Sequence, residues 1–193
     1  MPRPTVLILL LWLAFVLCWL VLAQFNKKAS KGTSSWAGWR LRFAIAFGLF
    51  ILVRFRRHAV VGTLASIHHT LPHPGIALQW VGVGLCLAGF AFAVWARVHI
   101  GRNWGMPMSL REGHELVTSG PYAYVRHPIY SGLMLAMIGS AFTAGLLWLL
   151  GPVLYFIYFI FAARSEEKTM LTQFPDAYPA YRRRTKMLIP FVF

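Results

Sequence analysis

Residues 76–95 read IALQWVGVGLCLAGFAFAVW, an apolar run in which Gln79 is the most polar side chain. Twenty residues in an α-helix rise about 30 Å, which matches the hydrocarbon core of a bilayer. The run therefore predicts a transmembrane helix. Gly82, Gly84 and Gly89 lie within it and no strand precedes them, so we expect a contact between helices rather than a nucleotide-binding loop.

Four other apolar blocks accompany this run. They cover residues 5–25, 43–53, 129–150 and 152–163, and we predict a transmembrane helix from each. The block 43–53 is short and has to borrow length from its flanks. Gly151-Pro152 predicts a tight turn between the last two helices. The predicted fold class is all-α, a polytopic membrane protein with about five transmembrane helices.

The first block could instead be a cleavable secretion signal. Its apolar stretch exceeds the roughly 7–15 residues of such signals, and further membrane segments follow, so we expect it to remain as a helix. We divide the chain into residues 1–75, with the first two helices, and residues 76–193, with the other three, a polar loop and a basic tail.

Composition supports a membrane protein. The 193-residue chain is 58% hydrophobic and 12% charged, whereas soluble domains carry about 25% charged residues. The net charge of +14 comes from 19 Lys and Arg against 5 Asp and Glu. The basic residues occupy the gaps between apolar blocks, which is typical of contacts with lipid headgroups and argues against a nucleic-acid partner.

The orientation follows from the last two helices. Because they form a hairpin, the loop 97–127 and the segment after residue 163 lie on one membrane face, which the positive-inside rule places in the cytoplasm. Five spans would put the N-terminus outside. Arg54, Arg56 and Arg57 would then violate the rule, so the number of spans and the N-terminal orientation stay open.

One polar string precedes the block 129–150. It reads Glu115-Leu-Val-Thr-Ser-Gly-Pro-Tyr-Ala-Tyr-Val-Arg-His-Pro-Ile-Tyr-Ser-Gly132. Pro128 is expected near the start of a helix, where proline is tolerated. A helix start offers free N–H groups and the positive end of the dipole. With Arg126 and His127, it suits an anionic group such as a carboxylate.

Glu166 and Glu167 form the complementary feature. Adjacent carboxylates repel each other and are unfavourable near the C-terminal end of a helix, so we expect a compensating cation. An ammonium or a sulfonium would serve, and so would an arginine: Arg102, Arg111, Arg164 or Arg182. Together with the string above, the pair predicts a cytoplasmic pocket for a zwitterionic ligand, roofed by Tyr122, Tyr124 and Tyr130.

These motifs carry a resemblance to a known family. Residues 120–132, Glu166-Glu167, the segment Phe174-Pro-Asp-Ala-Tyr178 and Tyr181 resemble the isoprenylcysteine carboxyl methyltransferases. The related phospholipid methyltransferases share the RHPxYxG and EE elements. The likeness covers about residues 97–190 and includes Arg102-Asn103-Trp104.

The resemblance implies a membrane enzyme that takes a methyl group from S-adenosylmethionine, a zwitterion with a sulfonium and an aromatic base. It implies catalytic roles for Arg126 and Glu167. It places the cofactor on His114, Leu116, Val117, Gly120, Tyr122, His127, Pro128, Tyr130, Glu166 and Glu167. The expected acceptor is a lipophilic molecule with a prenylcysteine-like carboxylate. A phospholipid amine is the alternative, for which Glu167 or His127 could remove the proton.

Other functions are less well supported. His68, His69 and His73 lack an acidic or cysteine partner, so we expect no metal site. Cys18 and Cys86 fall in apolar blocks and are expected to pack. Arg182, Arg183 and Arg184 predict a patch at the lipid surface. A non-catalytic membrane scaffold would conflict with the intact RHPxY and EE elements, and a reductase would need a nicotinamide motif that is not visible.

Overall fold

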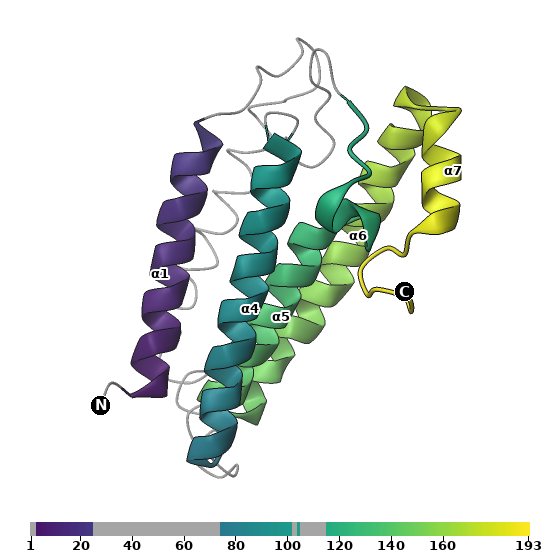
Figure 1. Ribbon diagram of the computed structural model, residues 1–193. Helices are drawn as coiled ribbons and strands as arrows, with labels where there is room; N and C mark the ends of the chain where they lie inside the picture. The colour runs from purple at the N-terminus through teal and green to yellow at the C-terminus, as the bar shows by residue number, and fades with distance from the viewer. Residues whose placement is uncertain (1–2, 25–73, 102–103, 105–114) are drawn as a thin grey trace, which may run out of the picture.

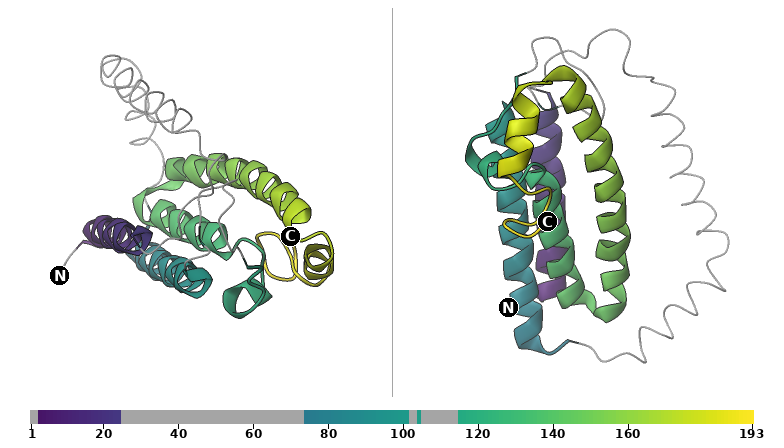
Figure 2. Two further views of the ribbon diagram at one scale, coloured as in Figure 1. Left: turned by 90° about the horizontal axis from the view of Figure 1, so that it is seen from above. Right: turned by 90° about the vertical axis from the view of Figure 1, so that its right-hand side faces the viewer.

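The computed structural model describes residues 3–24, 74–101, 104 and 115–193 (Figure 1). Within these ranges, four long helices lie side by side: α1 (Pro4–Ala23), α4 (Ile76–Ile100), α5 (Pro128–Ala144) and α6 (Leu150–Gln173). A short helix, α7 (Ala177–Arg184), packs beside the end of α6. The views in Figure 2 show the order α1, α4, α5, α6 across the bundle, with α7 at its edge. The described part of the chain contains no strand, so the all-α prediction is confirmed there.

Two described helices are long and apolar enough to cross a membrane, Pro4–Leu22 and Ile76–Ile100. The apolar helix α5 is shorter, with 17 residues. Helix α6 has 24 residues and continues past the apolar block through Arg164 and Lys168, as expected. The predicted block 43–53 lies outside the described residues. Five spans therefore stay a prediction.

The turn between α5 and α6 differs from the prediction. It is formed by Gly145 and the 3-10 helix η3 (Leu146–Leu149), and not by Gly151-Pro152. Gly145 has a φ of 123°, which favours glycine and ends α5. Pro152 lies in the first turn of α6, where an N–H group would have no acceptor within the helix, so proline loses no hydrogen bond there.

Small residues bring α4 and α5 together. A Cβ atom on Gly82 would lie 2.5 Å from Thr143 Oγ1, and one on Gly89 would lie 2.5 Å from Gly132 O. These two glycines are therefore at a helix contact, as predicted. Gly84 differs, because a Cβ atom there would meet nothing within 4 Å. The contact is tied by the Thr143 hydroxyl, which donates to Gln79 O at 3.0 Å.

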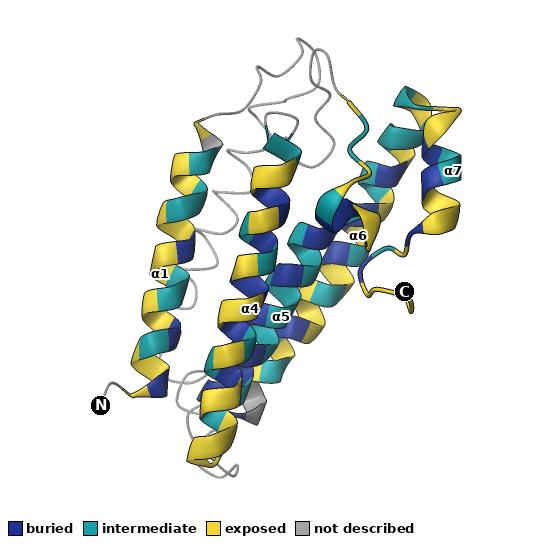
Figure 3. Ribbon diagram, in the orientation of Figure 1, coloured by how far each residue is buried: buried dark blue, intermediate teal, exposed yellow. Residues whose placement is uncertain are grey.

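The outer surface of the bundle is apolar. Figure 3 shows exposed residues along the outward faces of α1, α4 and α6. They include Leu9 on α1 and Leu154 and Phe161 on α6, each at least 66% exposed. Water would solvate so large an apolar surface poorly, whereas lipid chains solvate it well. The bundle therefore has the surface of an integral membrane protein.

Candidate functional site

The turn before α5 is built around Gly120. It begins the 3-10 helix η2 (Gly120–Ala123) with a φ of 59°. A Cβ atom there would lie 2.6 Å from the ring of His99, so the positive φ favours glycine and any side chain would also displace that ring. Tyr122 is buried in this turn and stacks on His99, with 6.5 Å between ring centroids. The predicted site residue Tyr122 is thus fixed against the end of α4.

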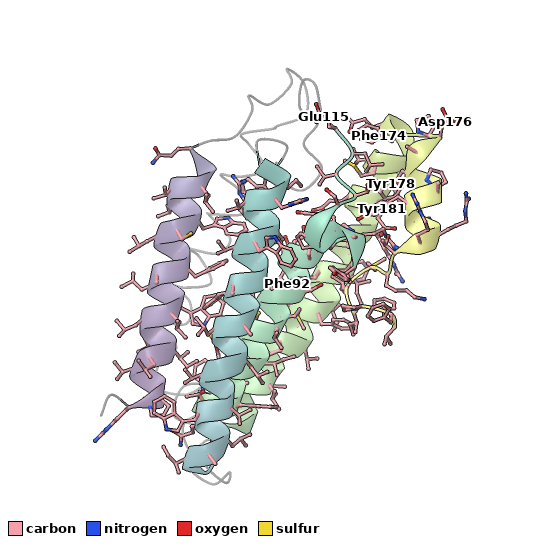
Figure 4. The ribbon with its side chains drawn as sticks, viewed as in Figure 1. Phe92, Glu115, Phe174, Asp176, Tyr178 and Tyr181 are labelled. Atoms are coloured by element: carbon pink, nitrogen blue, oxygen red, sulfur yellow. The ribbon has the colours of Figure 1, made fainter. Side chains whose placement is uncertain are left out.

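The C-terminal segment holds the next residues in place. The Arg126 amide donates to Lys186 O at 2.8 Å and the His127 amide donates to Met187 O at 3.1 Å. The Tyr181 hydroxyl of α7 donates to the buried carbonyl of Tyr122 at 2.7 Å. Figure 4 shows Tyr181 and Tyr178 on α7, turned toward the bundle. Segments about 60 residues apart thus build one site.

Glu167 lies at the centre of a buried ionic cluster. Its Oε1 is 2.7 Å from Arg126 Nε and 3.5 Å from His127 Nε2, and its Oε2 is 3.5 Å from Arg182 Nε. The Arg126 guanidinium also donates through Nη1 to the carbonyls of Thr185 and Arg182. The cation expected beside the glutamates is therefore Arg126, joined by Arg182.

Arg164 is exposed, whereas Arg102, Arg111 and the predicted cofactor contact His114 lie outside the described residues. The motif residues Arg126 and His127 therefore compensate the buried carboxylate in the described part of the chain. The catalytic role of Arg126 stays a prediction.

Glu166 is the more accessible carboxylate of the pair. Its side chain is 23% exposed, against 5% for Glu167. Glu166 Oε2 lies 3.2 Å from His127 Nδ1, and the Tyr130 hydroxyl donates to Oε1. The Tyr130 ring stacks on His127 and on Phe159, at 5.5 and 4.6 Å between centroids. The Glu166 carboxylate is thus held by two motif residues and reaches the surface.

The charges of the cluster reinforce one another. Burial alone would lower the pKa of His127, but the Glu166 and Glu167 carboxylates outweigh it and raise that pKa above its ordinary value. Burial would likewise raise the pKa of Glu167, but His127 and Arg126 outweigh it and lower that pKa. His127 directly precedes α5, and Glu167 lies beyond the apolar block 152–163 of α6. The buried Glu167 carboxylate thus lies beside Arg126, His127 and Arg182, and the charged forms of Glu167 and His127 favour each other.

The remaining predicted residues surround this cluster. Leu116 and Val117 are half-buried in the irregular segment before η2, and Pro128 is buried at the first turn of α5. Tyr124, predicted to roof the pocket, is 54% exposed. Figure 4 shows Glu115 at the same end of the bundle as Phe174 and Asp176. The polar loop and the C-terminal segment thus meet at one end, as the hairpin predicted.

Arg97 is an important residue that the sequence argument missed. It is only 2% exposed and donates to Leu22 O at 2.6 Å and to Gly101 O at 2.9 Å. Its guanidinium lies 4.7 Å from the ring centroid of Trp104. An arginine in the last turn of a helix that begins as a membrane span is a signal that could have been used, because cations suit helix C-termini.

Comparison with known proteins places these features in context. Residues 77–177 match the family described as Phospholipid methyltransferase. A protein-S-isoprenylcysteine O-methyltransferase of Schizosaccharomyces pombe is 26% identical over 171 residues, which cover 82% of this chain and 72% of that protein. Methanethiol S-methyltransferase 2 of Bradyrhizobium diazoefficiens is 38% identical over 73 residues, or 37% of this chain and 27% of that protein.

The fold has a counterpart among solved structures. The eukaryotic intramembrane Ras methyltransferase, an isoprenylcysteine carboxyl methyltransferase, is similar with a TM-score of 0.56 and 25% identity. The match covers 70% of this chain and 54% of that one, so the chain spans about half the length of this structure. The family match over residues 77–177 includes Arg126, His127, Glu166 and Glu167 of the ionic cluster.

Proposed function

The chain belongs to the phospholipid methyltransferase family and is similar to isoprenylcysteine carboxyl methyltransferases, and from this premise we propose that it methylates a lipophilic acceptor with S-adenosylmethionine. The first-choice acceptor is a prenylcysteine-like carboxylate. The observation that carries the proposal is the pairing of Glu166 and Glu167 with Arg126, His127 and Tyr130 at the polar end of α5 and α6.

The residues present suit the cofactor. Glu167 is occupied by Arg126, whereas Glu166 keeps an exposed edge that can accept an ammonium. His127 Nε2 is buried 3.5 Å from Glu167 Oε1, too far for a good hydrogen bond, so a polar ligand atom could satisfy it. We propose Glu166 as the carboxylate that binds the amine. The other proposed contacts are His114, Leu116, Val117, Gly120, Tyr122, His127, Pro128, Tyr130 and Glu167.

When bound, S-adenosylmethionine would supply the methyl group as an electrophile on a sulfonium. The chain has to hold the acceptor in line with that group and keep water out. A carboxylate acceptor needs no base. An amine acceptor has to lose a proton, yet His127 and Glu167 have pKa values shifted toward their charged forms. The first shift lowers the share of neutral imidazole and the second weakens Glu167 as a base, which supports the carboxylate acceptor.

Arg126 and Glu167 are the proposed catalytic pair. The Arg126 charge would attract an acceptor carboxylate, and Glu167 would fix the guanidinium through the 2.7 Å contact. The basic residues of α7 lie at this end of the bundle. By the positive-inside rule, their position supports a site on the cytoplasmic side. We also propose that the chain has five transmembrane helices and that residues 76–193 form the methyltransferase core.

A phospholipid amine is the second candidate acceptor. The description of the matched family favours it. The two candidates differ in chemistry, because one product is an ester and the other is a methylated amine. The acceptor is therefore best identified from the product.

The decisive experiment uses the full chain in lipid nanodiscs with radiolabelled S-adenosylmethionine. An S-prenylated cysteine with a free carboxyl is expected to gain label that alkaline hydrolysis releases. Its preformed methyl ester is the matched control and should gain none. If phosphatidylethanolamine gained the label instead, the acceptor would be the phospholipid amine and not the carboxylate. If S-adenosylhomocysteine bound but no acceptor gained label, a non-catalytic scaffold would be favoured.

A further inference from the structure

Residues 188–193 form a closed loop with an apolar tip. The amides of Leu188 and Ile189 donate to Phe193 O at 2.7 and 2.6 Å, and the amides of Val192 and Phe193 donate to Ile189 O at 3.1 and 3.0 Å. Pro190 has no N–H to satisfy. The amides on both sides of the tip thus bond within the loop. At its tip Phe191 is 86% exposed and Val192 is 72% exposed.

The loop lies beside the apolar part of α6. The Phe193 ring is 6.2 Å from the Phe156 ring, and Phe156 precedes Glu166 by ten residues on one helix. At about 1.5 Å per residue, this contact is about 15 Å along the helix from the ionic cluster. Figure 1 shows the chain end beside α6, beyond α7 and away from the polar end. Leu154 and Ile157 are exposed on the same stretch of α6.

A group of basic side chains precedes the loop. Arg182, Arg183 and Arg184 end α7, and Lys186 follows. All four are exposed. Arginine binds phosphate through paired hydrogen bonds, and lysine binds it as a point charge. Basic residues beside an apolar tip are typical of segments that lie at the boundary between headgroups and acyl chains.

We propose that residues 182–193 form a membrane hook. Its apolar tip, Ile189, Phe191 and Val192, enters the acyl region of the leaflet on the side of the site, while Arg183, Arg184 and Lys186 contact phospholipid phosphates. The amides that flank the tip bond within the loop, which lowers the cost of this placement, because hydrocarbon offers no hydrogen-bond partners. The occupant of this apolar surface is therefore the bilayer itself.

The hook is joined directly to the candidate site. Lys186 and Met187 accept the backbone bonds of Arg126 and His127, and the Ser131 hydroxyl donates to Leu188 O at 2.5 Å. The insertion of the tip therefore fixes the depth of the site relative to the lipid surface. The proposal of the hook is argued from packing, charge and backbone hydrogen bonds, and it does not depend on which reaction takes place at the site.

The test is a depth profile with a fluorophore on single cysteines. Cys18→Ser and Cys86→Ala first remove the native thiols. Phe191→Cys, Lys186→Cys and Asp176→Cys then place the same environment-sensitive fluorophore at the tip, beside the arginines and at the far end of α7. Each protein is reconstituted in phosphatidylcholine nanodiscs with nitroxide on the acyl chain or on the headgroup, and aqueous iodide is a third quencher.

We expect acyl-chain nitroxide to quench the label at residue 191 at least severalfold more than the label at residue 176. Headgroup nitroxide should act most strongly at residue 186, and iodide at residue 176. Iodide quenching at residue 191 equal to that at residue 176 would overturn the hook. Protection of residue 191 from all three quenchers would also overturn it, because another protein copy would then cover the tip. S-adenosylhomocysteine binding by each labelled protein tests the proposed function separately.

Discussion

Arg126 Nε lies 2.7 Å from Glu167 Oε1, and the two side chains are only 8% and 5% exposed. A buried pair of this kind is strongly destabilising when one member is removed, since the other charge stays buried without compensation. The pair joins the turn before α5 to α6, so it bears on both stability and the geometry of the site.

Removal of the Arg126 charge should therefore destabilise the protein by roughly 3–5 kcal/mol. Arg126→Gln leaves Glu167 with His127 and the more exposed Arg182. The double variant Arg126→Gln/Glu167→Gln should recover part of the loss, because the buried anion is gone as well. Thermal unfolding in detergent measures both. Additive losses in this cycle would contradict a direct interaction between the two side chains.

Stability should depend on pH on both sides of a maximum. The lowered pKa of Glu167 contributes stability above its ordinary value of about 4.3, and this is lost as the pH falls through the folded pKa. The raised pKa of His127 contributes stability below about 6.5, and this is lost as the pH rises through the folded pKa. Tm should therefore be highest between about pH 4.5 and 6.5.

His127→Asn is the control for the alkaline side of this profile. It should flatten the fall of Tm above pH 6.5, because the titrating imidazole is absent. The fall below pH 4.5 should remain, since Glu167 still has Arg126. An unchanged alkaline slope in this variant would assign the effect to another group.

Glu166 and Glu167 should separate in their effects on ligand binding and folding. Glu166→Gln removes a charge at the surface edge of the cluster, so we expect S-adenosylhomocysteine to bind roughly tenfold to a hundredfold more weakly. Tm should fall less than in Glu167→Gln, because the Glu166 carboxylate is the more exposed of the two, although it also supports the charged form of His127. Glu167→Gln alters the buried pair and should lower Tm. Calorimetric titration and thermal unfolding distinguish them, and the reverse pattern would make Glu167 the ligand carboxylate.

The glycines of α4 provide a matched pair for the helix contact. A Cβ atom on Gly89 would meet the backbone of Gly132 and Ala136, whereas one on Gly84 would meet nothing within 4 Å. Gly89→Ala should cost about 1–3 kcal/mol of stability, since the helices have to move apart. Gly84→Ala should be neutral or slightly stabilising, because alanine favours the helix. Equal effects on Tm would mean that α4 and α5 are not in close contact.

Local sequence patterns predicted the helices and much of the ionic cluster. Apolar runs predicted α1, α4 and α5, because the length of such a run decides whether a helix can span a membrane. Arg126, His127 and Glu166 were predicted as site residues from their charges, because a helical hairpin is enough to bring the two segments to one membrane face. The turn at Gly145 was not predicted, because Gly151-Pro152 is the stronger local signal for a turn. Proline is also common in the first turn of a helix, which is where Pro152 lies.

The contacts of the C-terminal segment were beyond local patterns. Lys186 and Met187 pair with Arg126 and His127 through backbone atoms, which leave no trace in side-chain identity. Arg97 was overlooked for a similar reason, because its partners are the carbonyls of Leu22 and Gly101 and the ring of Trp104. Which carboxylate of the pair reaches the surface also depends on the rotation of α6, and not on sequence order.

Tyr181 should act through the turn that carries Tyr122. Burial raises the pKa of Tyr181 to about 12, so its hydroxyl stays a donor at working pH, and it donates to Tyr122 O at 2.7 Å. Tyr181→Phe leaves this buried carbonyl without its partner, at a cost of about 1–3 kcal/mol. Because Tyr122 then loses its anchor, the affinity for S-adenosylhomocysteine should also fall. Tyr124→Phe removes a hydroxyl from a ring that is 54% exposed and should change neither Tm nor affinity. Unfolding and calorimetry on the two variants decide the matter, since a loss of Tm without a loss of affinity would make the Tyr181 bond purely structural.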